Sequence, residues 1–397
     1  MEQPKTILIL GASYSQIPLM EAARRLGFKV CAATIRGDYK GIKYADEVIW
    51  ADITDPDAVT EAAKACGASG IATCCMDIGI RSLGAACSAL GLPGPGREAA
   101  EAAANKLLEK DLYARGGVNT ARYKKVSSVS GLREALLQLR FPVIVKAVDQ
   151  MGSRGIMRCD TPEEAERGFA FSMAATKQNY CIVEEFLQGE MFGAEAMIYN
   201  GEPVYVLPLG NDTRDGNPPF PVGHYVPWGH PELDEKVREQ VRAAARALGF
   251  DNCAMDLDLM LCGEEIYVIE ATCRAGATCI TDTVGIYYGI DYYEAIVKTA
   301  MGIDPGEMFR GPQVPRRASV TRLLSAKEAG TVSAIEVPDP LPPGVVDLSF
   351  NIKEGDAVRP MTNGADRIGQ LIIEGATAEE CRRVMDEVLG GIRIAVV

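Results

Sequence analysis

The chain has 397 residues, more than one compact hydrophobic core normally serves, so we expect two or three domains. Hydrophobic residues make up 47% and charged residues 24%, the balance of an ordinary globular protein. The net charge of −13 argues against general binding to nucleic acid or to anionic membranes. No apolar run approaches the length of a membrane span.

The cysteines and histidines argue against a zinc site. Twelve cysteines are scattered without a Cys-x-x-Cys spacing, and the only histidines are His224 and His230. The first residues carry no secretory signal, so we expect reduced thiols and a cytoplasmic protein.

The first hundred residues alternate between strand and helix patterns. "TILILGASYSQIPLMEAARRLGFKVCAAT", residues 6–34, predicts a strand, a glycine turn, a helix and a strand. The alternation continues to about residue 90, which indicates a doubly wound parallel sheet. The turn "GASYSQ" has one glycine and lacks G-x-G-x-x-G, so a structural turn or a loop facing a small ligand is favoured over a dinucleotide site.

The next segment combines a strand lysine with a glycine loop. Residues 91–96 are rich in Pro and Gly and suit a domain edge, and the alanine-rich run after them predicts a helix. In "FPVIVKAVDQMGSRGIMRC", residues 141–159, Lys146 lies on an apolar strand, where it needs a partner. Gly152 and Gly155 would let backbone amides approach phosphate oxygens. A plain hairpin with a snorkelling lysine remains an alternative.

Residues 182–187, "IVEEFL", place two acids in an apolar strand. Such a segment can offer a purine an apolar slot and backbone hydrogen bonds. An edge strand with a solvated acidic pair is equally consistent with it.

The hairpin in residues 254–276, "AMDLDLMLCGEEIYVIEATCRAG", places acids on neighbouring strands. Glu270, Thr272 and Arg274 follow at every second position and so share one face. Glu270 and either Asp256 or Asp258, which also share a face, offer hard oxygen ligands for Mg²⁺. Arg274 can clamp a phosphate or a carboxylate. A surface ladder of carboxylates is the alternative.

Several other residues have two interpretations. The Pro- and Gly-rich segment 211–231 either lines a substrate site with His224 or Arg214, or is only a long connection. Asp77, at a strand end, either contacts substrate or caps a helix. Arg322 either reaches the cleft or belongs to a solvated basic cluster. Cys273 should point away from Thr272 and Arg274 as a small buried residue.

These features occur in a specific order: a lysine on a helix, a strand lysine, a glycine loop, an apolar and acidic segment, paired acids and an arginine. The order resembles the ATP-grasp superfamily over nearly the whole chain. Within it, the chain resembles the carboxylate–amine ligases of the L-amino-acid ligase type. "GDAVRP" and "DRIGQLIIEG", residues 355–360 and 366–375, are similar to the C-terminal module of those ligases.

The resemblance implies a mixed α/β and α+β fold in three parts. These are an N-terminal doubly wound parallel α/β domain at residues 1–104, a two-lobed ATP-grasp domain at 105–311 and a small C-terminal α+β module at 312–397.

The resemblance also implies roles for individual residues. Lys106 and Lys146 would contact the phosphates of ATP. Lys146 and Arg274 would be catalytic, with Arg274 steadying an acyl phosphate and the tetrahedral intermediate. The loop over the phosphates would comprise Met151, Gly152, Ser153 and Gly155. Adenine would lie against Glu184, Glu185, Phe186 and Leu187, largely through their backbone.

The remaining implied roles involve departures from the family pattern. Glu190 would reach the ribose, although the family's glutamate usually stands one residue later, where this chain has Met191. Asp258, Glu270 and Thr272 would hold Mg²⁺, or Mn²⁺ in its place. The family usually has Asn where Thr272 stands, and a hydroxyl is a weaker ligand, so one ion would be held differently or more loosely.

The implied activity is an ATP-dependent carboxylate–amine ligation. ATP phosphorylates a carboxylate, an amine attacks the acyl phosphate, and a peptide or amide bond forms with release of ADP and phosphate. The alternatives are an ATP-grasp carboxylase that uses carboxyphosphate, or a nucleotide-binding homologue without ligase activity. The partners expected are a small carboxylate and an amine, both amino acids, with neither nucleic acid nor membrane. A homodimer is a family-level expectation.

Overall fold

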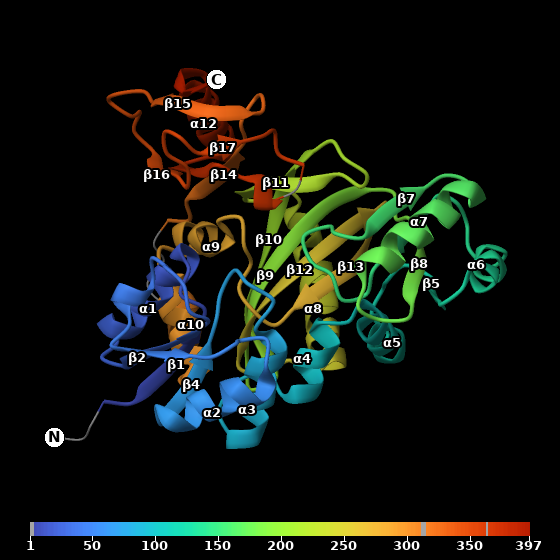
Figure 1. The fold of residues 1–397 in the computed structure, drawn as a ribbon, viewed down its shortest axis with the longest axis horizontal. Helices are drawn as coiled ribbons and strands as arrows, with labels where there is room; N and C mark the ends of the chain where they lie inside the picture. The colour runs from blue at the N-terminus through green and yellow to red at the C-terminus, as the bar shows by residue number, and fades with distance from the viewer. Residues whose placement is uncertain (1–3, 311–314, 363) are drawn as a thin grey trace.

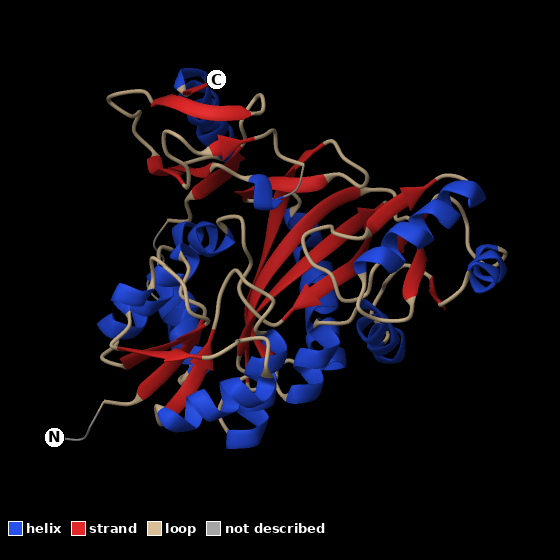
Figure 2. Ribbon diagram, viewed as in Figure 1, coloured by secondary structure: helices blue, strands red, loops and turns tan. Residues whose placement is uncertain are grey.

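A computed structural model describes residues 4–310, 315–362 and 364–397. It shows the expected mixture of a parallel α/β domain and α+β parts built on antiparallel sheets (Figures 1 and 2). The expected boundary at 104/105 falls between two helices, α4 (Arg97–Ala103) and α5 (Lys106–Gly116), and remains a prediction. The expected boundary at 311/312 lies outside the described residues.

The N-terminal domain is a doubly wound parallel sheet with strand order β3-β2-β1-β4. Alternate residues of its strands serve two cores: Ile7 and Ile9 face one helix layer, and Leu8 and Leu10 face the other. One layer holds α2 and α3, and the other holds α1 and α10, which is supplied by a much later part of the chain (Figure 1). The bounds are β1 Thr6–Leu10, β2 Lys29–Thr34, β3 Glu47–Trp50, β4 Ala68–Ala72, α1 Ile17–Arg25, α2 Pro56–Ala65, α3 Ile80–Leu90 and α10 Tyr292–Ala300.

A small lobe follows, built on an antiparallel sheet of order β5-β8-β6-β7. Its core lies between this sheet and helices α6 and α7. The bounds are β5 Tyr123–Val126, α6 Val129–Leu136, β6 Val143–Lys146, β7 Ile156–Cys159, α7 Pro162–Ala175 and β8 Cys181–Glu185.

A long antiparallel sheet forms the large lobe and continues into the C-terminal module, in the order β13-β12-β9-β10-β11-β14-β18-β16. Helix α8 packs on the core side of β9, β12 and β13. The large-lobe bounds are β9 Glu190–Tyr199, β10 Glu202–Arg214, β11 Phe220–Val226, α8 Asp234–Leu248, β12 Cys253–Cys262, β13 Glu265–Thr272, α9 Ile280–Tyr288 and α11 Gly306–Arg310.

The C-terminal module adds a second small sheet, β17-β15-β19, and helix α12 to its three strands of the long sheet. This is the expected small α+β module with a closing helix. Its bounds are β14 Ala318–Leu324, β15 Gly330–Glu336, β16 Val345–Phe350, β17 Ala357–Val358, β18 Gly369–Gly375, α12 Ala378–Gly391 and β19 Arg393–Val396.

The alanine-rich helix expected after residue 96 is divided in two by Asn105. The Asn105 side chain accepts hydrogen bonds from the amides of Leu107 and Leu108 at 3.0 and 3.4 Å, so it caps the start of α5. Gly117 ends the helix in a left-handed conformation. This break sets the position of Lys106, the first residue of α5.

No helix among the described residues is both long and apolar enough to cross a membrane.

Candidate active site

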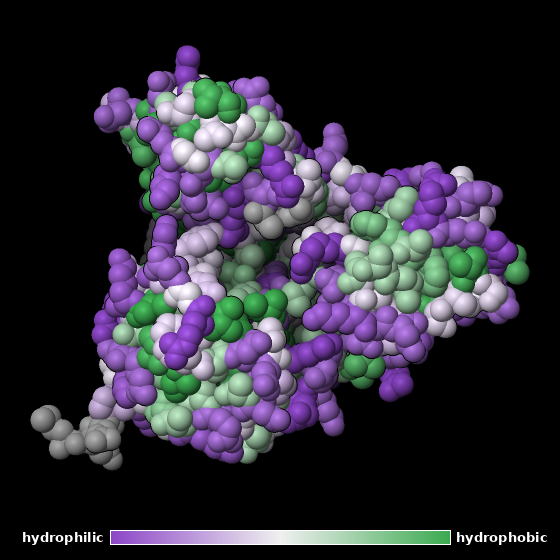
Figure 3. All heavy atoms as spheres, in the orientation of Figure 1, coloured by the Kyte–Doolittle hydropathy of each residue, from purple (hydrophilic) through white to green (hydrophobic). Residues whose placement is uncertain are grey.

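Two adjoining cavities lie between the small lobe and the long sheet. The first has a volume of about 500 Å³, within the usual range for small-molecule sites, and is lined by residues of β6, β8 and β9. The second extends toward Asp77 and Arg274. Figure 3 shows the surface hollowed between the N-terminal domain, the small lobe and the C-terminal module. Both cavities are lined by Lys106, Gly152, Ser153, Asp258 and Glu270.

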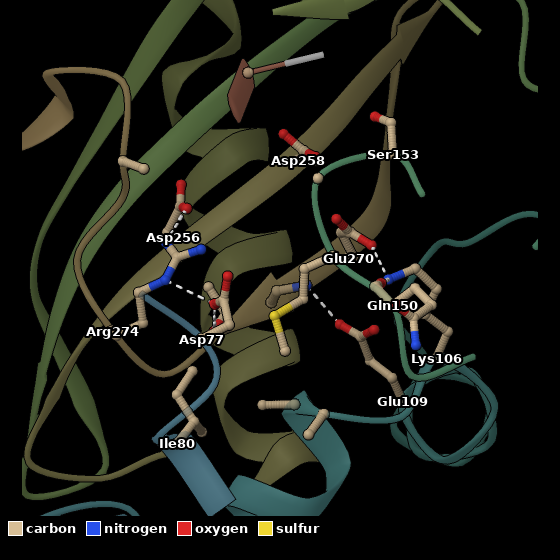
Figure 4. A pocket seen from close by; sticks show the side chains of 18 of the residues that line it. Asp77, Ile80, Lys106, Glu109, Gln150, Ser153, Asp256, Asp258, Glu270 and Arg274 are labelled. Carbon is tan, nitrogen blue, oxygen red and sulfur yellow. Dashed lines mark hydrogen bonds and ion pairs between the residues drawn. The ribbon is translucent and has the colours of Figure 1, made fainter. Parts of the chain in front are cut away.

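The β12–β13 hairpin brings Asp258 and Glu270 together, as the sequence predicted. The two residues are register partners across the hairpin, and both face the cavities (Figure 4). Burial, with the charges of Glu270 and Asp256, raises the pKa of Asp258 to about 8. Such a concentration of buried negative charge suits a divalent cation. Among the described residues, no group of three or more His, Cys, Asp or Glu side chains is arranged to hold a metal ion.

Lys106 lies at the junction of the two cavities. Its ammonium is 2.7 Å from Glu270 and donates a hydrogen bond to the Gln150 carbonyl at 3.1 Å. Burial would raise the pKa of Glu270, but the charge of Lys106 outweighs it and the pKa is lowered. Lys106 therefore connects the α5 terminus, the loop before Met151 and the acid pair.

Lys146 has the partner that its buried position required. Its ammonium is 3.2 Å from Glu184, which is also 3.3 Å from Lys110 of α5. The Glu184 side chain is only 3% exposed, so these charges are almost wholly removed from water. Its Oε1 atom is buried and has no hydrogen-bond partner among the described residues. Two buried cations, Lys146 at the cavity and Lys110 behind it, therefore share one carboxylate.

The loop from Met151 to Gly155 borders both cavities. Gly152 and Ser153 line them together with Asp258 and Glu270 (Figure 4). Gly155 has φ +66°, and a Cβ there would lie 2.6 Å from the Ala175 Cβ and 2.8 Å from the Ala147 Cβ. Gly152 has φ +63°, but a Cβ there would meet no atom within 4 Å. Gly155 is thus required for packing, whereas Gly152 leaves open space in front of the loop.

The segment predicted to bind adenine forms one wall of the first cavity, with Glu184, Glu185, Phe186 and Leu187 all lining it. The Glu185 carboxylate is 3.4 Å from the Arg122 guanidinium and accepts from the Arg140 amide at 3.1 Å. The amides of Glu185 and Phe186 donate to the carbonyls of Arg122 and Pro142, both at 2.9 Å. Those two amides are thus already engaged.

Glu190 also lines the first cavity. Its carboxylate accepts a hydrogen bond from the Trp228 indole at 2.9 Å and lies 3.2 Å from His230 Nε2. The sequence did not indicate these two partners, because they come from the far end of segment 211–231.

Arg274 lies in a network that spans two domains. Its Nε is 2.7 Å from Asp77 and its Nη1 is 2.5 Å from Asp256 (Figure 4). Burial would lower the pKa of Arg274, but the charges of Asp77 and Asp256 outweigh it and the pKa is raised. Thr272 donates its hydroxyl to Asp77 at 3.1 Å. Its role as a metal ligand stays a prediction.

The other candidates divide between the cavities and elsewhere. His224 lines the second cavity and is buried on β11, so segment 211–231 is not merely a connection. Arg214 lies outside both cavities and donates to Ser325 at 3.1 Å. Arg322 pairs with Asp212 at 2.7 Å rather than reaching the cleft.

Asp77 does not cap α3, whose N-cap is Gly79. Cys273 is buried in the core, as expected.

Sequence reasoning missed two residues of α5, Glu109 and Lys110. The Glu109 carboxylate accepts hydrogen bonds from the Tyr113 hydroxyl at 2.6 Å and from the Ala271 amide. Ala271 stands between Glu270 and Thr272, the two predicted metal ligands on β13. Lys110 donates to Thr120 and pairs with Glu184. The available signal was the spacing of Lys106, Glu109, Lys110 and Tyr113, which places them on one helix face.

Comparison with known proteins identifies the family. The model of the phosphoribosylglycinamide synthetase ATP-grasp (A) domain matches residues 104–216, and that of the L-amino acid ligase C-terminal domain 2 matches residues 322–397. The crystal structure of phosphoribosylglycinamide synthetase from Anaerococcus prevotii is 36% identical, with a TM-score of 0.85 and 100% of both chains covered. The chain belongs to the ATP-grasp family. It is an enzyme of the ATP-grasp ligase type, which uses ATP to join a carboxylate to an amine.

Other ATP-grasp relatives are more distant. The L-amino acid ligase structure from Bacillus licheniformis has a TM-score of 0.85 at 20% identity, with 100% of both chains covered, and so shows the fold. Alanine–anticapsin ligase from Bacillus subtilis strain 168 is 26% identical over 64% of this chain and 60% of its own length.

Proposed function

We propose that this ATP-grasp enzyme joins two amino acids, activating the carboxylate of one as an acyl phosphate and releasing ADP and phosphate. The observation that carries the proposal is the meeting of the two cavities at Asp258 and Glu270. A nucleotide in the first cavity would direct its terminal phosphate toward the second, where Arg274 would receive the carboxylate substrate. Positioning and charge neutralisation would supply most of the catalysis.

The first cavity would hold ATP. Apolar side chains such as Ile144, Met260 and Ile269 line it beside the Glu184–Leu187 segment, as an adenine ring requires. Since two amides of that segment are engaged, the Leu187 amide and backbone carbonyls would recognise the purine edge. Lys106 and Lys146 would contact phosphate oxygens, and the Met151–Gly155 loop would cover them. Glu190 remains our proposed ribose contact.

Asp258 and Glu270 fit a magnesium ion, or manganese in its place. Mg²⁺ in nucleotide sites is commonly held by one or two carboxylates, with substrate phosphates and water as the other ligands. The raised pKa of Asp258 fits this, because burial and the neighbouring carboxylates Glu270 and Asp256 disfavour its charged form, which a divalent cation would stabilise. When bound, the ion would neutralise phosphate charge during transfer. Thr272 stays a proposed third ligand, provided that its hydroxyl turns from Asp77.

Arg274 and Lys146 would carry the reaction of the bound substrates. A carboxylate oxygen attacks the terminal phosphorus of ATP, the bond to the bridging oxygen breaks, and ADP leaves. The amine nitrogen then attacks the acyl carbon, and phosphate leaves as the amide forms. Arg274 would steady the negative oxygens of both steps, because two carboxylates already fix its plane.

The charges of the second cavity favour an amino acid as the amine substrate over a phosphate-bearing amine. The described residues that line this cavity include six acids but only two permanent cations, Lys106 and Arg274. In this proposal Lys106 contacts ATP and Arg274 contacts the carboxylate substrate, so the described lining of the cavity offers no further permanent cation to a phosphate-bearing amine. The acids are Asp77, Glu109, Asp149, Asp256, Asp258 and Glu270.

The proposal includes a cytoplasmic location, which the twelve free cysteines support. A homodimer is part of the proposal at family level only.

The test is ADP release with MgATP over a matrix of amino acids offered in pairs, with products identified by mass spectrometry. We expect ADP release to require two amino acids, and the product to be lighter than their sum by one water. ADP release with bicarbonate alone would instead indicate a carboxylase. ATP binding without turnover on any pair would indicate a homologue that has lost the reaction.

The assignment of Asp258 and Glu270 to a metal ion has a separate test. The affinity for ATP is measured once with Mg²⁺ present and once with EDTA, which removes the ion. Asp258→Asn and Glu270→Gln should lose the Mg²⁺-dependent gain in ATP affinity. Glu264→Gln is the matched control, because this acid is exposed at the turn of the same hairpin and lines neither cavity. A Glu270→Gln variant with an unchanged magnesium response would exclude Glu270 as a ligand.

A further inference from the structure

We propose that a third cavity, between the β10–β11 hairpin and the C-terminal module, is a separate binding site for a small organic anion with an apolar body. The cavity has a volume of about 690 Å³, which falls within the range of small-molecule sites. Its walls come from β10, β11, β14, the end of α12 and β19. The inference does not depend on the proposed ligase activity.

The floor of this cavity is apolar. Val222 and Leu323 are 6% and 4% exposed and pack with Met361 in a small cluster of their own. Leu389 and Ile392, at the end of α12, are half-buried and line the same space. A ligand with an aliphatic or aromatic body would therefore remove further apolar surface from water.

The rim of the cavity is cationic. Four cations line it, and Asp215 is the only acid among the described residues that do so. Of the four, Lys327 and Arg393 form no ion pair or side-chain hydrogen bond with any described residue, and Arg214 bonds only to the uncharged Ser325. The cations are Arg214, Arg322, Lys327 and Arg393. The chain as a whole has a net charge of −13, so most of its surface would repel anions. The positive rim of this cavity would instead attract them.

Arg322 strengthens this interpretation because its bonding is incomplete. It pairs with Asp212, which Arg382 also contacts at 3.1 Å. The Arg322 Nε atom is buried yet has no hydrogen-bond partner among the described residues. A buried unsatisfied donor is costly. The Nε atom itself is covered, but the Arg322 side chain is 32% exposed and lines the cavity, so an anion there could bond to the rest of its guanidinium. Apolar floor, positive rim and unsatisfied donor together indicate a carboxylate, sulfonate or phosphate on an apolar body.

The cavity is separate from the ATP cavity but shares a wall with it. Thr213 of the β10–β11 hairpin lines both cavities. The tip of this hairpin contacts the small lobe, where the Asn217 side chain accepts a hydrogen bond from the Arg158 amide at 3.0 Å. The anion site is therefore tested with the ATP cavity filled.

The experiment is a fluorescence titration with 8-anilinonaphthalene-1-sulfonate in saturating MgATP. We expect saturable binding of one equivalent that weakens as salt is raised, and much weaker binding of uncharged N-phenyl-1-naphthylamine. The double variant Lys327→Gln/Arg393→Gln should bind the sulfonate about 10-fold more weakly. The charge-matched control is Lys353→Gln/Arg383→Gln, which alters two exposed cations outside the cavity and should bind as the wild type does.

Equal sulfonate affinity in the two double variants would overturn the proposal, because the rim would then contribute nothing. Equal binding of the uncharged probe would overturn it as well. All four substituted residues are exposed, so misfolding does not complicate the comparison.

Discussion

The guanidinium of Arg274 lies 2.7 Å from the carboxylate of Asp77, across the junction between the large lobe and the N-terminal domain. The backbone reinforces this contact, because the Cys75 amide donates to the Ala275 carbonyl at 3.1 Å. Arg274 is therefore oriented by a residue that lies almost two hundred positions earlier in the chain. The N-terminal domain therefore contributes a side chain to the candidate active site.

Asp77→Asn should lower kcat by about 10- to 100-fold, the effect of losing one charge-assisted hydrogen bond, with the KM for ATP little changed. The reason is that Asp77 fixes Arg274 and does not line the ATP cavity. Steady-state kinetics measure both constants. Asp38→Asn, which removes an exposed acid from the same domain, is the control. A parallel rise in the ATP KM would contradict a role confined to Arg274.

Glu184→Gln should destabilise the protein by about 3–5 kcal/mol, because it leaves Lys110 and Lys146 buried without their shared counter-charge. Chemical denaturation gives the free energy of unfolding. The neighbouring Glu185→Gln removes only pairs with Arg122 and Arg140, which are 59% and 83% exposed, and should cost no more than about 1 kcal/mol. Similar costs for the two variants would show that the buried pairs are not held as described.

Gly155→Ala should cost stability by two routes, the strained left-handed backbone and the clash with Ala147 and Ala175. We expect about 2–4 kcal/mol in total, against about 1–2 kcal/mol for Gly152→Ala, where the backbone is also left-handed but space is open. Thermal or chemical unfolding measures both. Equal losses would mean that packing around Gly155 is looser than the structure shows.

His224 should make stability fall on mild acidification. Burial lowers its pKa to about 4, with the charge of Asp212 opposing this only in part. The unfolded chain therefore binds the proton first, so this residue's stabilisation is complete above about pH 6.5 and is lost between about pH 6.5 and 4. Between pH 7 and 5 the wild type should lose about 2 kcal/mol more than His224→Gln. Identical losses in denaturation experiments would contradict this assignment.

The β12–β13 hairpin shows what the sequence could predict. Period-two spacing put Glu270 and Thr272 on one face of their strand and Asp256 and Asp258 on one face of theirs, and the predicted hairpin made the two strands neighbours. The register of the hairpin brings Asp258 opposite Glu270. Lys146 was predictable because a lysine in an apolar strand needs a counter-charge. Both inferences depend on neighbours close in sequence, where backbone geometry leaves few choices.

The rest of the site depends on tertiary packing. A charged face on α5 is ordinarily solvated, and only the position of that helix against β13 shows that Glu109 and Lys110 are buried. The partner of Arg274 likewise depends on how β4 meets the large lobe. The packing of α10 on the N-terminal sheet could not be predicted either, because this part of the layer that α10 shares with α1 comes from residues 292–300, far along the chain.

The continuity of the long sheet bears on how this chain can be divided. Strand β14 joins the large lobe through two register pairs with β11, Tyr225 with Val320 and Val226 with Ser319. A chain cut before Ala318 would leave β11 as an open edge with unpaired backbone groups, and such edges recruit strands from other molecules. The C-terminal module thus covers the edge of β11, because β14 supplies its hydrogen-bonding partner. We expect a protein shortened before Ala318 to aggregate through the exposed β11.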